Sequence, residues 1–251
     1  MQLVLLTALG VGGATIVGAL LGFSLHKIPE KWNNAVLSFA AGIMLAAAVI
    51  GLILPSVEMS GKRGIWMPII GILAGALFLN LMDRLTPHLH HLSGVSEETH
   101  RNNASLNKIL LFVMAIALHN LPEGLAAGVG FGTGDIGNAI TVAIGIMLQN
   151  IPEGAVIISP MLLAGISKKR ALLIGSMTGV VEVLGTFVGY FAATISGSIL
   201  PFALAFAGGT MLYVISDEMI PETHSHGNES LSTYSLLVGF IVMLVMDVML
   251  G

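Results

Sequence analysis

Two short segments of the chain repeat one pattern of residues that can bind a cation. The first begins at His119 and reads HNLPEG, and the second begins at Gln149 and reads QNIPEG. Residues four apart share one face of a helix, so His119 lies over Glu123 and Gln149 lies over Glu153. One imidazole, one carboxamide and two carboxylates at this spacing predict a first cation site.

A second cation site is predicted beside the first. Asn120 and Asn150 point about 100° away from their neighbours on the helix, so they serve an adjacent pocket while the two glutamates lie between. Glu182 is an acid in an otherwise apolar segment, and it fits a third carboxylate of this second site. The chain contains no Cys, which excludes the thiolate sites favoured by Cu(I) and leaves Zn²⁺, Fe²⁺, Mn²⁺ or Cd²⁺.

The proline and glycine of each motif shape the backbone around these ligands. Pro122 and Pro152 lack an N–H group, so they predict kinks that expose carbonyl oxygens in the middle of both helices. Gly124 and Gly154 carry no side chain, which allows another helix to approach closely. For any single proline or glycine, ordinary membrane-helix composition is the better explanation of its presence.

The elements that hold the two motifs must lie in a membrane. Of the 251 residues, 55% are hydrophobic and 10% are charged, with a mean hydropathy of +0.92. Soluble domains carry about 25% charged residues, so a water-soluble globular protein is excluded. Apolar runs of about 18 residues or more predict membrane-spanning helices. Eight such runs lie at approximately residues 3–23, 34–55, 65–82, 109–131, 138–161, 172–194, 202–220 and 232–250.

The carboxylates inside these spans have no fixed partner of opposite charge. An ionised side chain at the centre of a bilayer costs about 2.5 to 3.5 kcal/mol, even on the lenient insertion scale. Every Lys and Arg falls in a loop or at the end of a span. The compensating charge must therefore come from a proton or from a mobile cation. Protonated carboxyls that only pack the helices together are the structural alternative.

The basic residues predict how the chain is oriented. Eight of the ten Lys and Arg residues fall in the loops after the first, third, fifth and seventh spans, while Lys62 and Arg63 fall in the alternate loops. Basic residues near span ends mark the cytoplasmic side. We therefore expect a multi-pass protein of the cell membrane with both termini outside the cytoplasm. The only long loop, residues 83–107, is then cytoplasmic, and its histidines either bind zinc or belong to a solvated linker: His88, His90, His91 and His100.

The paired HNLPEG and QNIPEG motifs and the acid in the sixth of eight spans resemble the ZIP family of zinc and iron permeases over essentially the whole chain. The resemblance implies one transporter domain over residues 1–251, built as an all-α bundle of eight membrane-spanning helices with the fourth and fifth kinked. It also implies a binuclear mid-membrane site through which a divalent metal enters the cytoplasm, with zinc ahead of iron, manganese and cadmium. The first site would comprise His119, Glu123, Gln149 and Glu153, and the second would comprise Asn120, Glu123, Asn150, Glu153 and Glu182.

Further features are implied by the resemblance alone. Asp217 and Glu218 at the end of span seven, with Asp247 in span eight, match an inner, exit-side metal site. Spans one, four, five and six would slide as an elevator against the other four, and the protein would form a homodimer in the lipid membrane. Many family members have His where this chain has Gln149, and some have Asp where it has Asn150. These departures leave the preferred metal open.

Two other functional classes compete with metal transport. An intramembrane metalloenzyme would use His119 and Glu123 around a catalytic zinc, but no HExxH sequence occurs in the chain. A proton-driven transporter of another solute would use the carboxyls as a proton relay. Motifs for binding phosphate or nucleic acid are absent from the sequence. We therefore expect a transporter of divalent metal ions, not an enzyme.

Overall fold

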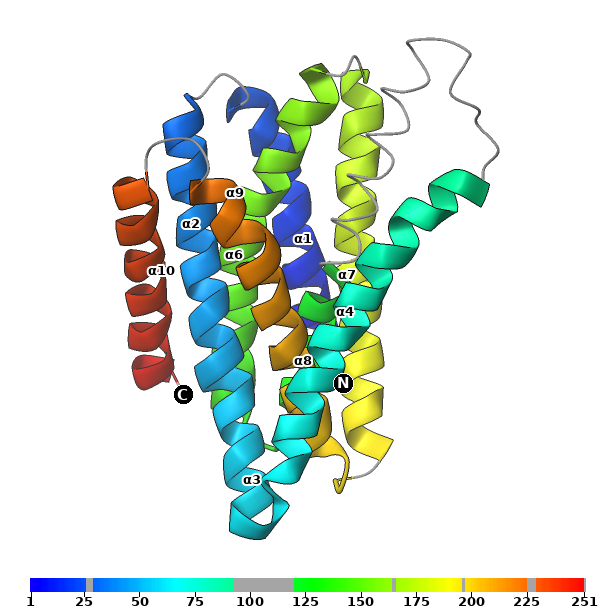
Figure 1. The fold of residues 1–251 in the computed structure, drawn as a ribbon, viewed down its shortest axis with the longest axis vertical. Coiled ribbons are helices and arrows are strands. Elements are labelled where there is room, and N and C mark those ends of the chain that lie inside the picture. The colour runs from blue at the N-terminus through cyan, green and yellow to red at the C-terminus, as the bar shows by residue number, and fades with distance from the viewer. Residues whose placement is uncertain (26–28, 93–119, 164–165, 196, 225–228, 251) are drawn as a thin grey trace.

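The computed structural model describes residues 1–25, 29–92, 120–163, 166–195, 197–224 and 229–250. Within these ranges the elements are all helices, and no strand occurs among them. Most of the helices lie side by side along the long axis of one bundle (Figure 1). The predicted all-α class is therefore confirmed.

The helices have the following bounds. In chain order they are α1 (Gln2–Leu25), α2 (Glu30–Ala46), the π-helix η1 (Ala47–Ile53), α3 (Leu54–Gly64), α4 (Trp66–Leu92), the 3-10 helix η2 (Gly130–Gly132), α6 (Ile136–Leu163), α7 (Lys168–Ile195), α8 (Leu200–Val214), the π-helix η3 (Ile215–Met219), α9 (Ile220–His224) and α10 (Glu229–Leu250). Residues 120–129 are also helical and lead directly into η2.

Six helical stretches among the described residues are long and apolar enough to cross a membrane. They are Gln2–Ser24, Glu30–Gly64, Ile136–Ser159, Lys168–Ile195, Leu200–His224 and Glu229–Leu250. The predicted third span corresponds to the shorter apolar stretch Trp66–Met82. Much of the predicted fourth span, up to residue 119, lies outside the described residues. The structure thus fits a multi-pass membrane protein, while the count of eight spans stays a prediction.

The expected kinks at the motif prolines are not confirmed. α6 is one α-helix that runs through Pro152, and the described part of the other motif helix begins only two residues before Pro122. Distortions occur instead at η1 and η3, which end shortly before Pro55 and Pro221. A π-helix widens one turn, and such widening is frequently found at functional sites.

A side chain from α6 serves a carbonyl group that a proline leaves without its usual partner. In a regular α-helix the N–H of residue 55 would bond to the carbonyl of Gly51, but Pro55 has no N–H. The amide Nδ2 of Asn138 donates a hydrogen bond to the Gly51 carbonyl at 3.1 Å instead. This bond joins α6 to the distorted turn of η1.

The described helices fall into two groups by their packing. α1 lies against both α6 and α7, whereas α8 packs on α4 and α10 packs on α2. Contacts between the groups are made chiefly by α2, α10 and η1 with α6. This division matches the two sets of spans that the family resemblance implies.

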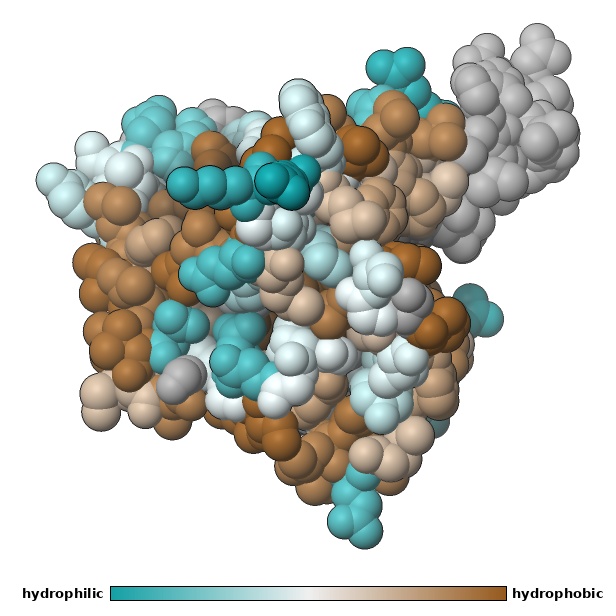
Figure 2. Space-filling model, turned by 90° about the horizontal axis from the view of Figure 1, so that it is seen from below, coloured by the Kyte–Doolittle hydropathy of each residue, from teal (hydrophilic) through white to brown (hydrophobic). Residues whose placement is uncertain are grey.

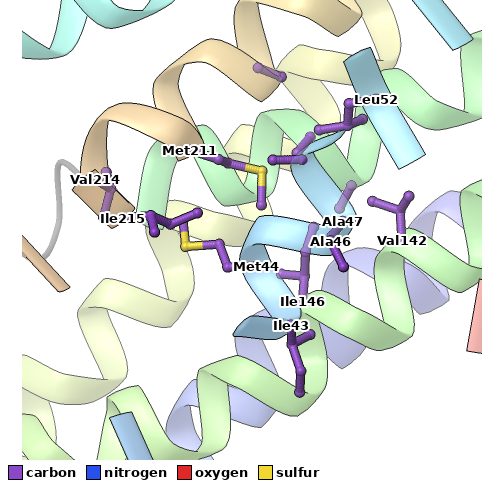
Figure 3. Packing of buried hydrophobic residues seen from close by; sticks show 14 of the residues in the cluster. Ile43, Met44, Ala46, Ala47, Leu52, Val142, Ile146, Met211, Val214 and Ile215 are labelled. Carbon is purple, nitrogen blue, oxygen red and sulfur yellow. The ribbon is translucent and has the colours of Figure 1, made fainter. Parts of the chain in front are cut away.

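The seam between the two groups is apolar. Fully buried side chains of α2, among them Ile43 and Ala46, form one apolar cluster with side chains of α6 (Figure 3). Val142 and Ile146 of α6 contribute to the same cluster. A seam of this kind carries few directional bonds, so few hydrogen bonds oppose sliding of one group along the other.

The outer surface carries many exposed apolar side chains. Large apolar side chains are exposed along α4, α7 and α10, including Leu77, Leu184 and Val248. In the view from below, hydrophobic side chains occupy much of the rim (Figure 2). Such exposed apolar surface fits a multi-pass membrane protein.

α4 is longer than the predicted third span. The helix continues past Met82 to Leu92, so the backbone at His88, His90 and His91 is helical. The predicted loop of residues 83–107 is therefore helical over its first part. The remainder, with His100, lies outside the described residues.

Candidate metal centre

Side chains from three helices meet in the first helix group. Helix 120–129 supplies Asn120 and Glu123, α6 supplies Gln149 and Asn150, and α7 supplies Glu182. All five of these side chains are buried, and Glu123 and Glu182 are each 0% exposed. The structure therefore brings together most of the residues in the two predicted sites.

The motif glycines let the helices approach closely enough to form this centre. A Cβ atom on Gly124 would overlap the backbone carbonyl oxygen of Glu182. A Cβ atom on Gly154 would likewise overlap the carbonyl oxygen of Thr15 on α1. Close helix contacts of this kind need residues without side chains, as the sequence pattern predicted.

Glu182 accepts hydrogen bonds from three helices. The Thr15 hydroxyl donates to Oε1 at 2.7 Å and to Oε2 at 2.9 Å. Asn120 Nδ2 donates to Oε1, and Asn150 Nδ2 donates to Oε2 at 2.8 Å. Both oxygens of this buried carboxylate are therefore occupied by donors, and the network ties α1, helix 120–129 and α6 to α7.

The orientation of the Asn150 amide follows from its partners. Its Nδ2 group donates to Glu182 and also to the backbone carbonyl of Val11, at 3.3 Å. A carbonyl can only accept, so the NH₂ group must face both partners. The Oδ1 atom of Asn150 is consequently directed away from them.

Gln149 and Glu123 form the second polar contact of the centre. Gln149 Nε2 donates to Glu123 Oε1 at 2.8 Å, across the space between α6 and helix 120–129. The NH₂ group of Gln149 is thus turned to the carboxylate, and its carbonyl oxygen Oε1 is left on the other side.

Three buried oxygen atoms in the centre have no hydrogen-bond partner among the described residues. They are Glu123 Oε2, Gln149 Oε1 and Asn150 Oδ1. More than nine in ten buried polar groups in proteins are paired, so three unpaired acceptors from three neighbouring residues require an explanation. Two amide carbonyl oxygens and an oxygen of an ionised carboxylate can only accept, and a bound cation would satisfy all three.

Glu153 adds negative charge at the edge of this set. Its side chain is half-buried, and its carboxyl group interacts electrostatically with Glu123 and Glu182. No group of three or more His, Cys, Asp and Glu side chains among the described residues is close enough to hold a metal ion by itself. A cation there would therefore need the amide oxygens too.

The remaining predicted ligands do not join this centre within the described part of the chain. His119 lies outside the described residues. Asp217 is exposed and Glu218 half-buried in η3, while Asp247 is half-buried near the end of α10, which packs on α2. The structure does not bring these three acids together as one cluster.

Sequence reasoning missed the contribution of α1. Thr15 and the carbonyl of Val11 both bond to the centre, yet neither belongs to a motif. A threonine in an apolar helix is usually bonded to its own backbone, so its residue type gave no signal. Only the packing of α1 against α6 and α7 identifies it.

Comparison with known proteins gives consistent matches. The family described as "ZIP Zinc transporter" matches residues 93–247. The chain is 40% identical to the zinc transporter GufA of Myxococcus xanthus over 98% of both chains. It is 36% identical to the zinc transporter ZIPB of Bordetella bronchiseptica, over 95% of this chain and 78% of the relative. It is 33% identical to the human zinc transporter ZIP11, over 95% of this chain and 94% of the relative.

Proposed function

Because the chain belongs to the ZIP zinc transporter family, we propose that it carries a divalent metal ion, zinc foremost, across the cell membrane into the cytoplasm. Members of this family are named as transporters and not as enzymes. The metalloenzyme alternative is therefore set aside.

The observation that carries the proposal is the set of three unpaired oxygens on Glu123, Gln149 and Asn150. Every Lys and Arg in the described part of the chain is exposed, so none of them neutralises the buried carboxylates. Fixed pairing by a basic residue, the usual compensation inside a membrane, is thus missing from these segments. A passing dication supplies both the charge and the bonds that the oxygens lack.

The ligands of the two predicted metal positions differ in their hydrogen bonding. The first site draws on Glu123, Gln149 and Glu153, with His119 added from outside the described residues, and Glu123 Oε2 and Gln149 Oε1 have no hydrogen-bond partner among the described residues. The second site needs Glu182, whose two oxygens are engaged by donors. We propose that the first site fills first, and that the second fills when Glu182 gives up a hydrogen bond.

The transported metal follows from the ligand types. The described ligands are carboxylate and amide oxygens. Such oxygens can bind zinc, iron, manganese and cadmium, and they discriminate less among these metals than an imidazole nitrogen does. Relatives named zinc transporters support zinc as the main substrate. We keep iron, manganese and cadmium as secondary substrates.

Replacing Gln149 by histidine is expected to increase zinc uptake relative to manganese uptake by about tenfold, because an imidazole nitrogen would stand where an amide oxygen is now unpaired. The ratio of the two uptake rates in cells that express equal amounts of protein measures this. Gln2→His, at the exposed start of α1, is the matched control. An unchanged ratio in Gln149→His would show that Gln149 does not contact the metal.

We propose that the helices of the first group move together with the metal. The bonds at Glu182 link α1, helix 120–129, α6 and α7, all of which belong to that group. The seam to the second group is apolar. These features support an elevator-like motion.

The distribution of charge supports an orientation with both termini outside the cytoplasm. In Figure 1 both termini lie in the lower half of the bundle, whereas Lys31 at the start of α2 and Lys168–Arg170 at the start of α7 belong to its upper end. Only Lys62 and Arg63 of the described basic residues lie at the lower end, in α3. By the positive-inside rule, the upper end faces the cytoplasm.

The function is tested with purified protein in lipid vesicles that enclose a zinc indicator. Zinc added outside should enter faster than in protein-free vesicles, and a chelator outside should stop the signal. Absence of zinc influx, together with uptake of an organic solute that chelators do not affect, would favour the proton-driven alternative.

A further inference from the structure

We propose that the Thr15 hydroxyl on α1 controls how readily a second metal ion binds at Glu182. This inference rests on the proposed transport function, because it concerns the second of the two metal positions. Thr15 is neither an acid nor a residue of either motif, and its role is defined only by its position against α7.

The carboxylate of Glu182 is surrounded by hydrogen-bond donors. A carboxylate has about four positions at which it accepts a bond. Thr15 makes one contact with each oxygen, and Asn120 and Asn150 make one each. Thr15 has a single O–H proton, which it shares between the two oxygens, so Glu182 accepts three hydrogen bonds. The hydroxyl lies 2.7 and 2.9 Å from the two oxygens, in the position that a cation bound to both oxygens would take, so such a cation can bind only if the hydroxyl is displaced from the carboxylate.

Of these donors, Thr15 is the one whose bond to Glu182 breaks when the carboxylate turns to a metal ion. The amide of Asn150 is held additionally by the carbonyl of Val11, which fixes it against α1. The Thr15 hydroxyl bonds only to Glu182 among the described residues, and it contacts both oxygens of that carboxylate. Rotation of the Glu182 carboxylate toward the metal would thus break the Thr15 bond while the amide of Asn150 stays anchored.

Thr15 itself cannot move away from Glu182 easily. Its side chain is 1% exposed. Its backbone carbonyl lies where a Cβ atom of Gly154 would be, and Gly12 and Gly179 meet in the same way between α1 and α7. The hydroxyl is therefore held against Glu182 by the packing of three helices, and the bond is lost only through movement of the carboxylate.

The consequence is a direction for the effect on metal affinity. If binding of the second ion breaks the Thr15 bond, the wild-type protein loses that bond on binding, whereas a protein without the hydroxyl has none to lose. Hydrogen bonds to charged groups are among the stronger ones in proteins. The variant should therefore bind the second ion about tenfold more tightly, and the first ion with unchanged affinity.

Equilibrium binding of zinc chloride to the purified full-length protein, followed with a competing zinc indicator, measures both binding events. Thr15→Val keeps the volume of the side chain and removes the hydroxyl, and Thr15→Ala removes it without the second methyl group. Thr15→Ser keeps the hydroxyl and should restore the wild-type curve. Thr7→Val places the same change at another buried threonine of α1 and should leave both events unaltered.

Zinc uptake provides a second measurement. Its half-saturating concentration and maximal rate should change differently if Thr15 only stabilised the fold. Thr15→Val should lower the zinc concentration for half-maximal uptake and also lower the maximal rate, because the more tightly held ion leaves more slowly. General damage to the fold would lower the maximal rate without lowering the half-saturating concentration.

The outcomes separate this inference from the proposed function. Wild-type protein that neither binds nor transports zinc would refute the proposed function. Wild-type transport combined with a Thr15→Val binding curve equal to, or weaker than, that of the wild type would overturn only the role of Thr15. A tighter second event in Thr15→Val and Thr15→Ala, with the wild-type curve in Thr15→Ser, would establish it.

Discussion

Replacement of Glu123 by glutamine is expected to reduce zinc uptake at least about 100-fold while the protein still folds. The amide oxygen of the new side chain can still accept the hydrogen bond that Gln149 donates to Glu123 Oε1. Its NH₂ group would then stand where the unpaired Oε2 now lies, and it would present a donor to the cation. Loss of indirect supports of a metal site already costs about 10- to 100-fold in affinity, so loss of a direct ligand should cost at least as much.

Zinc influx into vesicles, normalised to the amount of reconstituted protein, measures this effect. Glu123→Ala should be equally inactive. Glu229→Gln makes the same chemical change at an exposed position at the start of α10 and should transport at the wild-type rate. Wild-type influx through Glu123→Gln would mean that the ion does not pass this carboxylate.

Replacement of Gly154 by alanine is expected to disrupt the centre through a single added methyl group. The new Cβ atom would overlap the carbonyl oxygen of Thr15 and approach the amide nitrogen of Ala19 to 3.0 Å. Both obstacles are backbone atoms, so no side-chain rotation relieves the overlap and α1 must move away from α6. Overpacking of this kind costs about 1 to 3 kcal/mol.

The expected results are a lower midpoint of thermal unfolding and at least about tenfold less zinc uptake. The bond that Thr15 donates to Glu182 and the bond that the Val11 carbonyl accepts from Asn150 both depend on the close approach of α1 to α6. Gly13→Ala is the matched control, because a Cβ atom at Gly13 meets nothing within 4 Å. Equal stability and uptake in the two variants would show that the close contact between α1 and α6 is not needed.

The two buried carboxylates of the centre illustrate how one residue type takes two roles. Glu123 keeps an oxygen without a partner, whereas Glu182 is bonded by donors from three helices. Glu123 is thus prepared to bind a cation as it stands. Glu182 is prepared to hold helices together until a donor is displaced. A site that binds its ion through a mixture of free and engaged ligands can also release it, as transport requires.

Several features of this protein were determined by the sequence alone. The long apolar runs predicted the helices that the structure contains, because only a helix satisfies its own backbone in hydrocarbon. The repeated motif predicted contacts between its polar side chains and buried carboxylates, and Gln149 bonds to Glu123 while Asn120 and Asn150 bond to Glu182. The small size of Gly124 and Gly154 predicted close helix contacts, and these positions are where α7 and α1 approach.

Other features depended on contacts between distant segments and were decided by the tertiary structure. The sequence placed the helix distortions at Pro122 and Pro152, but the π-helices precede Pro55 and Pro221. A proline removes a hydrogen-bond donor wherever it stands, and the surrounding packing determines how the helix adjusts. The part played by Thr15 was invisible for a related reason. Its hydroxyl bonds to a carboxylate 167 positions away in the sequence, and local patterns carry no information about such a pairing.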